Sequence, residues 1–267
     1  TGVAEQIMIG MAAGMAQRGL KPFVYTIATF ALYRPFEFIR NDLCYQNLPV
    51  TIVGIGGGIT YSTLGATHHA QEDISVLSSL PNMNIIAPCD PLETESAVRW
   101  CSQDRLTGPV YLRLGKAGEP NLSEYAVEPW EFGKFRLISQ GQDIAIISYG
   151  TISKMALEVS VLLSNFGIRP ELYFASTLKP LDLKRMEEIY SRFSIIVVIE
   201  EHIQFGGLGM ALNTHAKEYS WNGKLLCFAL PNEFQHTYGS HQEILRNGGL
   251  TAENIFSKIR ESYNDSY

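Results

Sequence analysis

The first half of the chain alternates between two spacings of apolar residues, one typical of buried strands and one typical of helices. Continuous apolar runs predict strands at 23–27, 50–55, 84–87 and 110–114. Apolar residues at helical spacing predict helices at 7–18, 29–45, 73–79 and 92–101. Strands that alternate with helices in this order indicate a mostly parallel sheet covered by helices.

The same alternation restarts in the second half, after a segment that lacks periodicity. Apolar runs predict strands at 143–148, 170–174, 195–200 and 225–230. Helical spacing predicts helices at 154–166, 183–193 and 253–263, and the glycine-rich segment 206–209 opens another. Between the halves, 116–129 contains glycine and proline residues that favour turns. We therefore predict an α/β protein of two doubly wound domains, at 1–120 and 136–267, with a linker at 117–135.

Net charge and cysteine content exclude several classes of protein. A net charge of −6 over 267 residues provides no basic field for nucleic acid or an anionic membrane surface. The four cysteines are scattered and form no C-x-x-C pair, which argues against a zinc site and a disulfide framework. No apolar run has the length of a membrane span. We therefore expect a cytoplasmic protein without nucleic-acid or membrane partners.

Several side chains are candidates for chemistry, and each also has a purely structural interpretation. Glu5 lies just before an apolar helix, where a carboxylate is ordinarily a solvated charge that favours the helix dipole. Phe30, Tyr33 and Phe36 recur every third residue, as in a helical stripe that faces a core. Arg113 and Lys116 follow a strand, where cations can bind phosphate or can be ordinary edge charges.

Three further segments stay ambiguous on spacing alone. The glycine-rich turns at 56–58 and 206–209 can hold phosphate on backbone N–H groups, or can be tight turns at a sheet edge. His68 and His69, with two acidic residues at 72–73, suggest metal or acid–base chemistry but match no zinc spacing. A surface loop with adjacent histidines is the alternative interpretation.

Taken in order, these motifs resemble those of the transketolase family along nearly the whole chain. The matching segments are 2–6, 12–16, 29–31, 39–41, 65–69, 72–74, 81–83, 88–90, 108–116, 177–182 and 200–202. The chain is most similar to the small second subunit of split transketolases, with 1-deoxyxylulose-5-phosphate synthase a more distant relative. The resemblance implies a thiamine diphosphate pyrimidine-binding domain followed by a transketolase C-terminal-like domain.

The resemblance also assigns roles to individual residues. It implies that Glu5 contacts N1′ of the cofactor's aminopyrimidine and stabilises the tautomer that accepts the thiazolium proton. It makes His68 a catalytic histidine that faces the substrate. It places Lys116 where the family has a phosphate-binding arginine, with Arg113 as a second candidate. The aromatic wall around the pyrimidine would consist of Phe30, Tyr33 and Phe36.

Two positions depart from the family pattern. Leu64 stands where the family has an aspartate that contacts a substrate hydroxyl, and Gly56 stands at or near an upstream histidine. Leucine cannot accept a hydrogen bond, so one polar contact to the substrate is lost. We therefore expect an unusual substrate, such as a deoxy or nucleotide-linked sugar, or an aldehyde other than a pentose phosphate.

The family's diphosphate-binding segment, Gly-Asp-Gly followed by Asn, is absent from the sequence. The resemblance therefore implies that thiamine diphosphate lies between this chain and a separate diphosphate-binding, N-terminal transketolase-like subunit, which also binds the Mg²⁺ or Ca²⁺ ion. It implies a homodimer of this chain within a two-plus-two heterotetramer, active only when assembled. The family's first strand and helix are also expected upstream of Thr1.

The leading hypothesis is a transferase subunit that moves a two-carbon ketol unit from a ketose to an aldehyde, with sugars or sugar phosphates as substrates. Segments 67–74 and 81–83 favour it over the beta subunit of a 2-oxo acid dehydrogenase, which has the same architecture. A non-catalytic scaffold of the same fold is a third hypothesis. The departure at Leu64 favours a scaffold, whereas the presence of Glu5 argues against it.

Overall fold

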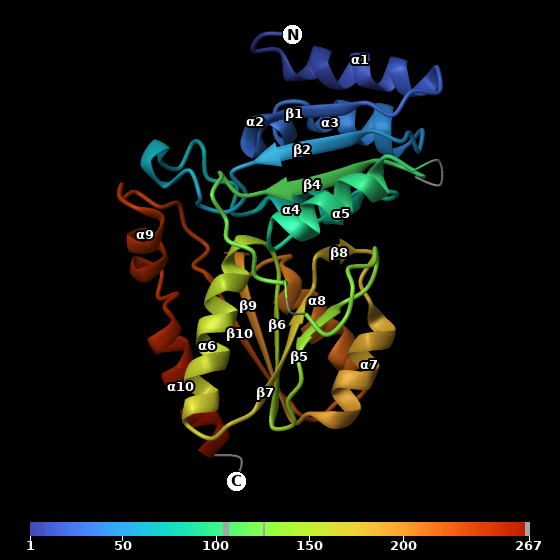
Figure 1. Cartoon of the computed structure of the whole chain (residues 1–267). Helices are drawn as coiled ribbons and strands as arrows, with labels where there is room; N and C mark the ends of the chain where they lie inside the picture. Colours follow the sequence, from blue (N-terminus) through green and yellow to red (C-terminus); the bar gives the residue numbers. More distant parts are fainter. Residues whose placement is uncertain (104–106, 125, 265–267) are drawn as a thin grey trace.

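The computed structural model describes residues 1–103, 107–124 and 126–264, in which the chain forms two five-stranded sheets (Figure 1). Residues 104–106 of the first predicted domain, 125 of the predicted linker and 265–267 of the second predicted domain lie outside the described residues. Within the described ranges, no helix is long and apolar enough to cross a membrane. The two mostly parallel sheets confirm the predicted α/β class.

Four parallel strands and one antiparallel strand form the first sheet, in the order β1-β2-β4-β3-β8. The parallel strands are β1 (Phe23–Ile27), β2 (Thr51–Ile55), β3 (Asn84–Ile86) and β4 (Val110–Leu114). Strands β2 and β4 are buried along most of their length, as expected of central strands with helices on both faces. Strand β8 (Thr177–Lys179) follows strands of the second sheet in sequence but pairs antiparallel with β3. It therefore ties the two halves of the molecule together.

Five helices and two short helical turns accompany the first sheet. They are α1 (Glu5–Gln17), α2 (Ala28–Leu32), α3 (Phe36–Phe38), the π-helical segment η1 (Ile39–Cys44), the 3₁₀ turn η2 (Ser62–Leu64), α4 (Asp73–Ser78) and α5 (Pro91–Cys101). Helix α1 lies along β1, at the edge of this sheet (Figure 1).

The single helix predicted at 29–45 is wrong. Helix α2 ends at Leu32, and a turn through Pro35 separates it from α3 and from the π-helical segment. Proline has no N–H to donate, and its ring conflicts with the carbonyl of the residue four positions earlier. The apolar spacing continues through this break, so the periodicity alone does not reveal it.

The second sheet has the order β10-β9-β6-β7-β5, and only β5 is antiparallel. Its strands are β5 (Arg136–Ser139), β6 (Ile144–Ser148), β7 (Pro170–Phe174), β9 (Ile195–Ile203) and β10 (Lys224–Leu230). The helices are the 3₁₀ turn η3 (Gly150–Ile152), α6 (Ser153–Asn165), α7 (Leu183–Arg192), α8 (Leu208–Glu218), α9 (His241–Asn247) and α10 (Ala252–Asn264). Helices α6 and α10 lie on one side of this sheet, and α7 and α8 on the other (Figure 1). The sequence pattern predicts neither α9 nor the edge strands β5 and β8.

One apolar core runs through both sheets. It joins Ile52 and Tyr111 of the first sheet to Ile147 and Val198 of the second, and all four side chains are buried. Apolar surface removed from water on this scale is the main stabilising contribution to folding. The carboxyl ends of β2 and β4 therefore have a fixed position relative to β9, and Arg113 and the loop after β2 lie at this junction.

Candidate active site

Glu5 is buried, although it is the first residue of helix α1. Its exposed fraction is 6%, and Ala4 before it provides no side-chain cap. A cavity of about 330 Å³ lies against Glu5, between the start of α1 and strand β1. A solvated helix-terminal charge would be exposed, so the burial of Glu5 disagrees with that interpretation and is consistent with a binding role.

Arg34 joins Glu5 to Phe30. Its Nη1 donates to Oε2 of Glu5 at 3.0 Å, and its Cζ lies 4.4 Å from the centre of the Phe30 ring. The Phe30 ring in turn meets the His68 ring edge-on, with 5.2 Å between the centroids. The structure therefore brings together three of the predicted site residues, Glu5, Phe30 and His68, and adds Arg34, which the sequence analysis missed.

The other two members of the predicted aromatic wall lie differently. Tyr33 and Phe36 are half-buried and pack against the apolar core, as a core-facing stripe would. The Tyr33 hydroxyl is buried without a hydrogen-bond partner among the described residues. Burial, followed by the charges of Asp73 and Glu72, raises the pKa of Tyr33 well above its ordinary value. Of the three rings, only Phe30 contacts both Arg34 and His68.

Several buried polar atoms in and just after α2, in the loop before α4 and at residue 235 lack a hydrogen-bond partner among the described residues. They are Thr29 Oγ1, the Tyr33 hydroxyl, both ring nitrogens of His69, Gln71 Oε1, Glu72 Oε2 and Gln235 Nε2. Burial lowers the pKa of His69 and raises the pKa of Glu72. Buried polar groups are nearly always paired, so an unpaired one such as Thr29 Oγ1 is open to a ligand, water or partner.

The loop after β2 contains both positions that depart from the family pattern. Gly56 has φ +83°, and a Cβ there would lie 2.0 Å from the Tyr61 ring, so Tyr61 fills the space beside it. The Lys116 Nζ atom lies 5.8 Å above the same ring, and Lys116 is exposed. Leu64 is 45% exposed in the turn η2. An exposed cation and an aromatic ring therefore lie together at Lys116, and an exposed apolar side chain lies three residues after Tyr61.

Arg113 is buried, whereas the predicted role as a phosphate ligand needs an accessible cation. It is 4% exposed, its Nε donates to Asp73 Oδ2 at 2.8 Å, and its Nη2 donates to the Glu201 carbonyl at 3.0 Å. The Tyr111 hydroxyl donates to the same Asp73 oxygen at 2.7 Å. Arg113 therefore forms a buried ion pair within the first domain and joins the two domains through its hydrogen bond to the Glu201 carbonyl. Its burial leaves Lys116 as the accessible cation of the two.

A second buried acid, Glu200, also escapes the sequence analysis. Burial raises the pKa of Glu200 to about 7, although it accepts hydrogen bonds from the backbone N–H groups of Gly209 and Leu208 and from the Tyr149 hydroxyl. The neighbouring Glu201 accepts from the Ile59 N–H of the first domain at 2.7 Å. The acidic pair at the carboxyl end of a very apolar strand is the signal that points to these groups.

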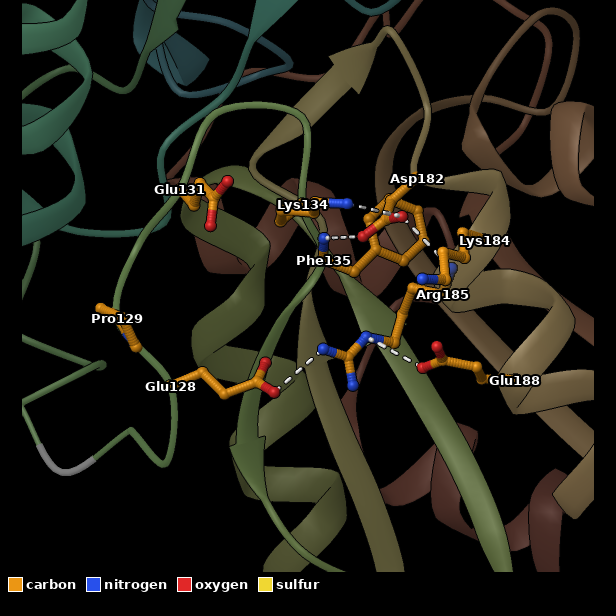
Figure 2. A pocket seen from close by; sticks show the side chains of 9 residues that line it. All are labelled: Glu128, Pro129, Glu131, Lys134, Phe135, Asp182, Lys184, Arg185 and Glu188. Atoms are coloured by element: carbon orange, nitrogen blue, oxygen red, sulfur yellow. Dashed lines mark hydrogen bonds and ion pairs between the residues drawn. The ribbon is translucent and has the colours of Figure 1, made fainter.

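A charged groove of about 350 Å³ lies on the second domain, between the segment before β5 and helix α7 (Figure 2). Arg185 pairs with Glu128 at 2.9 Å and with Glu188 at 3.7 Å, and Asp182 accepts from the Phe135 N–H at 3.1 Å. The ion pair between Arg185 and Glu128 holds helix α7 to the segment before β5, so it contributes to the stability of the fold. No predicted site residue lines the groove. Within the described ranges, no three His, Cys, Asp or Glu side chains group as metal ligands would.

Comparisons with known proteins agree across nearly the whole chain. The family model for the transketolase pyrimidine binding domain matches residues 1–119, and that for the transketolase C-terminal domain matches 133–255. One subunit of the apulose-4-phosphate transketolase of Phocaeicola vulgatus is 34% identical over 95% of this chain and 80% of its own length. The 1-deoxy-D-xylulose-5-phosphate synthase of Clostridium botulinum is 33% identical over 98% of this chain but only 42% of its own length.

A solved structure provides a third likeness. A split gene transketolase, described as an inactive β4 tetramer, superposes with a TM-score of 0.88 at 32% identity. The superposition covers 99% of this chain and 83% of that one. This agreement in fold and sequence confirms the predicted resemblance in both domains.

Proposed function

The chain belongs to the transketolase family, and we propose that it is the C-terminal subunit of a thiamine diphosphate-dependent enzyme that transfers a two-carbon ketol unit from a ketose to an aldehyde. The observation that carries the proposal is the buried Glu5 carboxylate, which Arg34 joins to the Phe30 ring. That ring in turn meets the ring of His68. The matching family models are those of transketolase, which favours ketol transfer over oxo acid dehydrogenation.

The residues present fit the pyrimidine half of the cofactor. A buried carboxylate and an aromatic face suit a flat heterocycle, and the unpaired Thr29 hydroxyl next to Phe30 leaves a polar atom for it to satisfy. When bound, thiamine diphosphate supplies the carbon nucleophile that makes and breaks the carbon–carbon bond. Glu5 would hold the proton at N1′, and Phe30 would orient the ring by contact with its face.

The remaining predicted residues would act on the substrate. His68, half-buried with Nδ1 at 3.0 Å from the Thr67 hydroxyl, would move protons at the substrate oxygens. Lys116, exposed above Tyr61, would bind a terminal phosphate or another anion. The leucine at 64 supports the proposal that the preferred substrate is an unusual sugar, because its side chain cannot accept a hydrogen bond from a substrate hydroxyl.

We assign the diphosphate and its Mg²⁺ or Ca²⁺ to a separate diphosphate-binding subunit. The similar Phocaeicola vulgatus chain is named as one subunit of its transketolase, and the similar split-gene structure is described as an inactive β4 tetramer. We therefore propose a homodimer of this chain inside a two-plus-two heterotetramer. The cofactor would lie at the boundary between the two kinds of subunit, with Glu5 on this side of it.

The test is the Glu5→Gln variant in the assembled complex, with Glu95→Gln as the control because Glu95 is exposed on helix α5. We expect Glu5→Gln to lower kcat by ~10²- to 10⁴-fold without disrupting assembly, since it removes a proton-holding group. Initial rates would be measured with pentose phosphates, deoxy sugars and nucleotide-linked sugars. Unchanged turnover in Glu5→Gln would favour the non-catalytic scaffold. A high rate with ordinary pentose phosphates would contradict the proposal that the preferred substrate is an unusual sugar.

A further inference from the structure

Arg34 contacts the two side chains that a bound pyrimidine would need, Glu5 and Phe30. It lies in the turn between α2 and α3, directly before Pro35, and its guanidinium reaches Glu5 Oε2 at 3.0 Å. The same guanidinium lies over the Phe30 ring, with Cζ 4.4 Å from the centroid. One cation therefore contacts both the buried carboxylate and the face of the aromatic ring.

A flat heterocycle protonated at the nitrogen that faces Glu5 would make the same two contacts. Its ring would stack on Phe30, and its N–H would donate to the Glu5 carboxylate. The space over one ring face holds one planar group at a time, because stacked groups lie in van der Waals contact. We propose that Arg34 is an intramolecular competitor of the cofactor's aminopyrimidine, which must displace the guanidinium from Glu5 and Phe30 in order to bind.

The burial of Glu5 gives Arg34 a physical role before the cofactor arrives. An unpaired carboxylate that is only 6% exposed would be strongly destabilising, and the guanidinium compensates its charge. The Arg34 side chain is itself 43% exposed, so it can swing into water at low cost when a better partner takes its place. The proposal rests on the proposed function, because it assumes that the ring which replaces Arg34 is that of thiamine diphosphate.

The first experiment measures the Kd of thiamine diphosphate for the assembled complex by equilibrium dialysis, with Mg²⁺ present. Arg34→Met keeps the apolar stem but removes the planar cation. We expect it to tighten binding ~3- to 30-fold, the combined effect of losing a half-exposed ion pair and a cation–π contact that compete with the ring. Arg99→Met is the matched control, because Arg99 forms an exposed pair with Glu95 at 2.7 Å, and it should leave Kd unchanged.

The second experiment requires neither partner nor cofactor. In this chain alone, Arg34→Met should lower the thermal unfolding midpoint, because it leaves the Glu5 carboxylate buried without a counter-charge. In a Glu5→Gln background the same substitution should have a much smaller effect, since the charge is already gone. Equal effects in both backgrounds would show that the pair does not form in solution, which overturns the proposal.

The outcomes separate this proposal from the proposed function. Binding that is equal or weaker in Arg34→Met than in the wild-type complex overturns the competition but leaves the cofactor role of Glu5 intact. A crystal structure of the cofactor-loaded complex with Arg34 still over Phe30 and still paired with Glu5 would do the same. Failure of every complex, wild type included, to bind thiamine diphosphate would reject the proposed function and the competition together.

Discussion

At the scale of single residues, burial separates two cations that lie close together in sequence. Arg113 points into the junction of the domains, where it pairs with Asp73 and donates to the carbonyl of Glu201. Lys116 lies just past the same strand and is exposed. A buried guanidinium with fixed partners contributes to holding the domains in register, whereas an exposed amine can change partners when a ligand arrives.

The buried pair predicts a large loss of stability when one partner is removed. Arg113→Met leaves the Asp73 carboxylate buried without its counter-charge and should lower the free energy of unfolding by about 3–5 kcal/mol. Urea unfolding of the chain measures this, with Lys116→Met as the control that should change stability by less than about 0.5 kcal/mol. The double variant Asp73→Asn with Arg113→Met should recover part of the loss. An Arg113→Met chain as stable as the control would show that the pair contributes little.

At the scale of elements, the central strands were predictable because their signal is local. Strands β2 and β6 and the first five residues of β9 carry no charged residue, and β4 and β7 each contain a single one, a pattern that a buried strand or a buried helix explains. The edge strands β5 and β8 are short, and they form because of antiparallel partners supplied by the tertiary structure. Helix α9 was readable in principle, since Ser240 and Glu243 form a capping box at its start.

The candidate site was only partly predictable for a related reason. Spacing alone favoured structural interpretations of Glu5 and of the aromatic stripe, and only the ordered resemblance to a family assigned them to one site. The contact between Arg34 and Glu5 depends on the turn at Pro35, which redirects the chain after α2. The burial of Arg113 depends on the second domain packing over β4, so no local pattern in the sequence distinguishes it from Lys116.

Helix α8 provides a prediction about pH. The residue at its N-terminal cap, Gly207, has no side chain to cap the helix, so Glu200 of β9 accepts from the N–H groups of Leu208 and Gly209 instead. Burial raises the pKa of Glu200 from its ordinary value of 4.5 to about 7. Between these values the folded chain retains a proton that the unfolded chain has lost, so the free energy of unfolding should fall as pH rises, by at most roughly 3 kcal/mol.

The measurement is urea unfolding of the wild-type chain and of Glu200→Gln at steps from pH 4.5 to 7. Burial also raises the pKa of Glu72 and of Glu93, so the wild-type slope contains several contributions, and the difference between the two chains isolates that of Glu200. A shallower fall in the variant supports the assignment. Parallel curves would show that Glu200 ionises alike in the folded and unfolded states.

At the scale of the whole molecule, the shared core fixes the domains to each other, while one edge carries exposed apolar surface. Helix α1 presents Ile7, Met11 and Met15 to solvent at intervals of four residues, so they lie on one side of the helix. Strand β1 beside it is the edge of the first sheet and exposes Phe23 and Tyr25. Apolar side chains exposed together on neighbouring elements are typical of a surface that another segment or subunit covers.

This apolar face predicts where the diphosphate-binding subunit docks, because α1 begins at Glu5, whose site that subunit is proposed to complete. Met11→Lys would place a charge where the partner must exclude water, so it should weaken binding of the partner subunit at least ~10-fold in titration calorimetry. The unfolding midpoint of the chain should stay unchanged, since Met11 is 56% exposed. Val161→Lys on α6, 58% exposed in the other domain, is the matched control. Equal partner affinity in Met11→Lys and Val161→Lys would show that the interface does not include α1. It would also contradict the assignment of Glu5 to a subunit boundary.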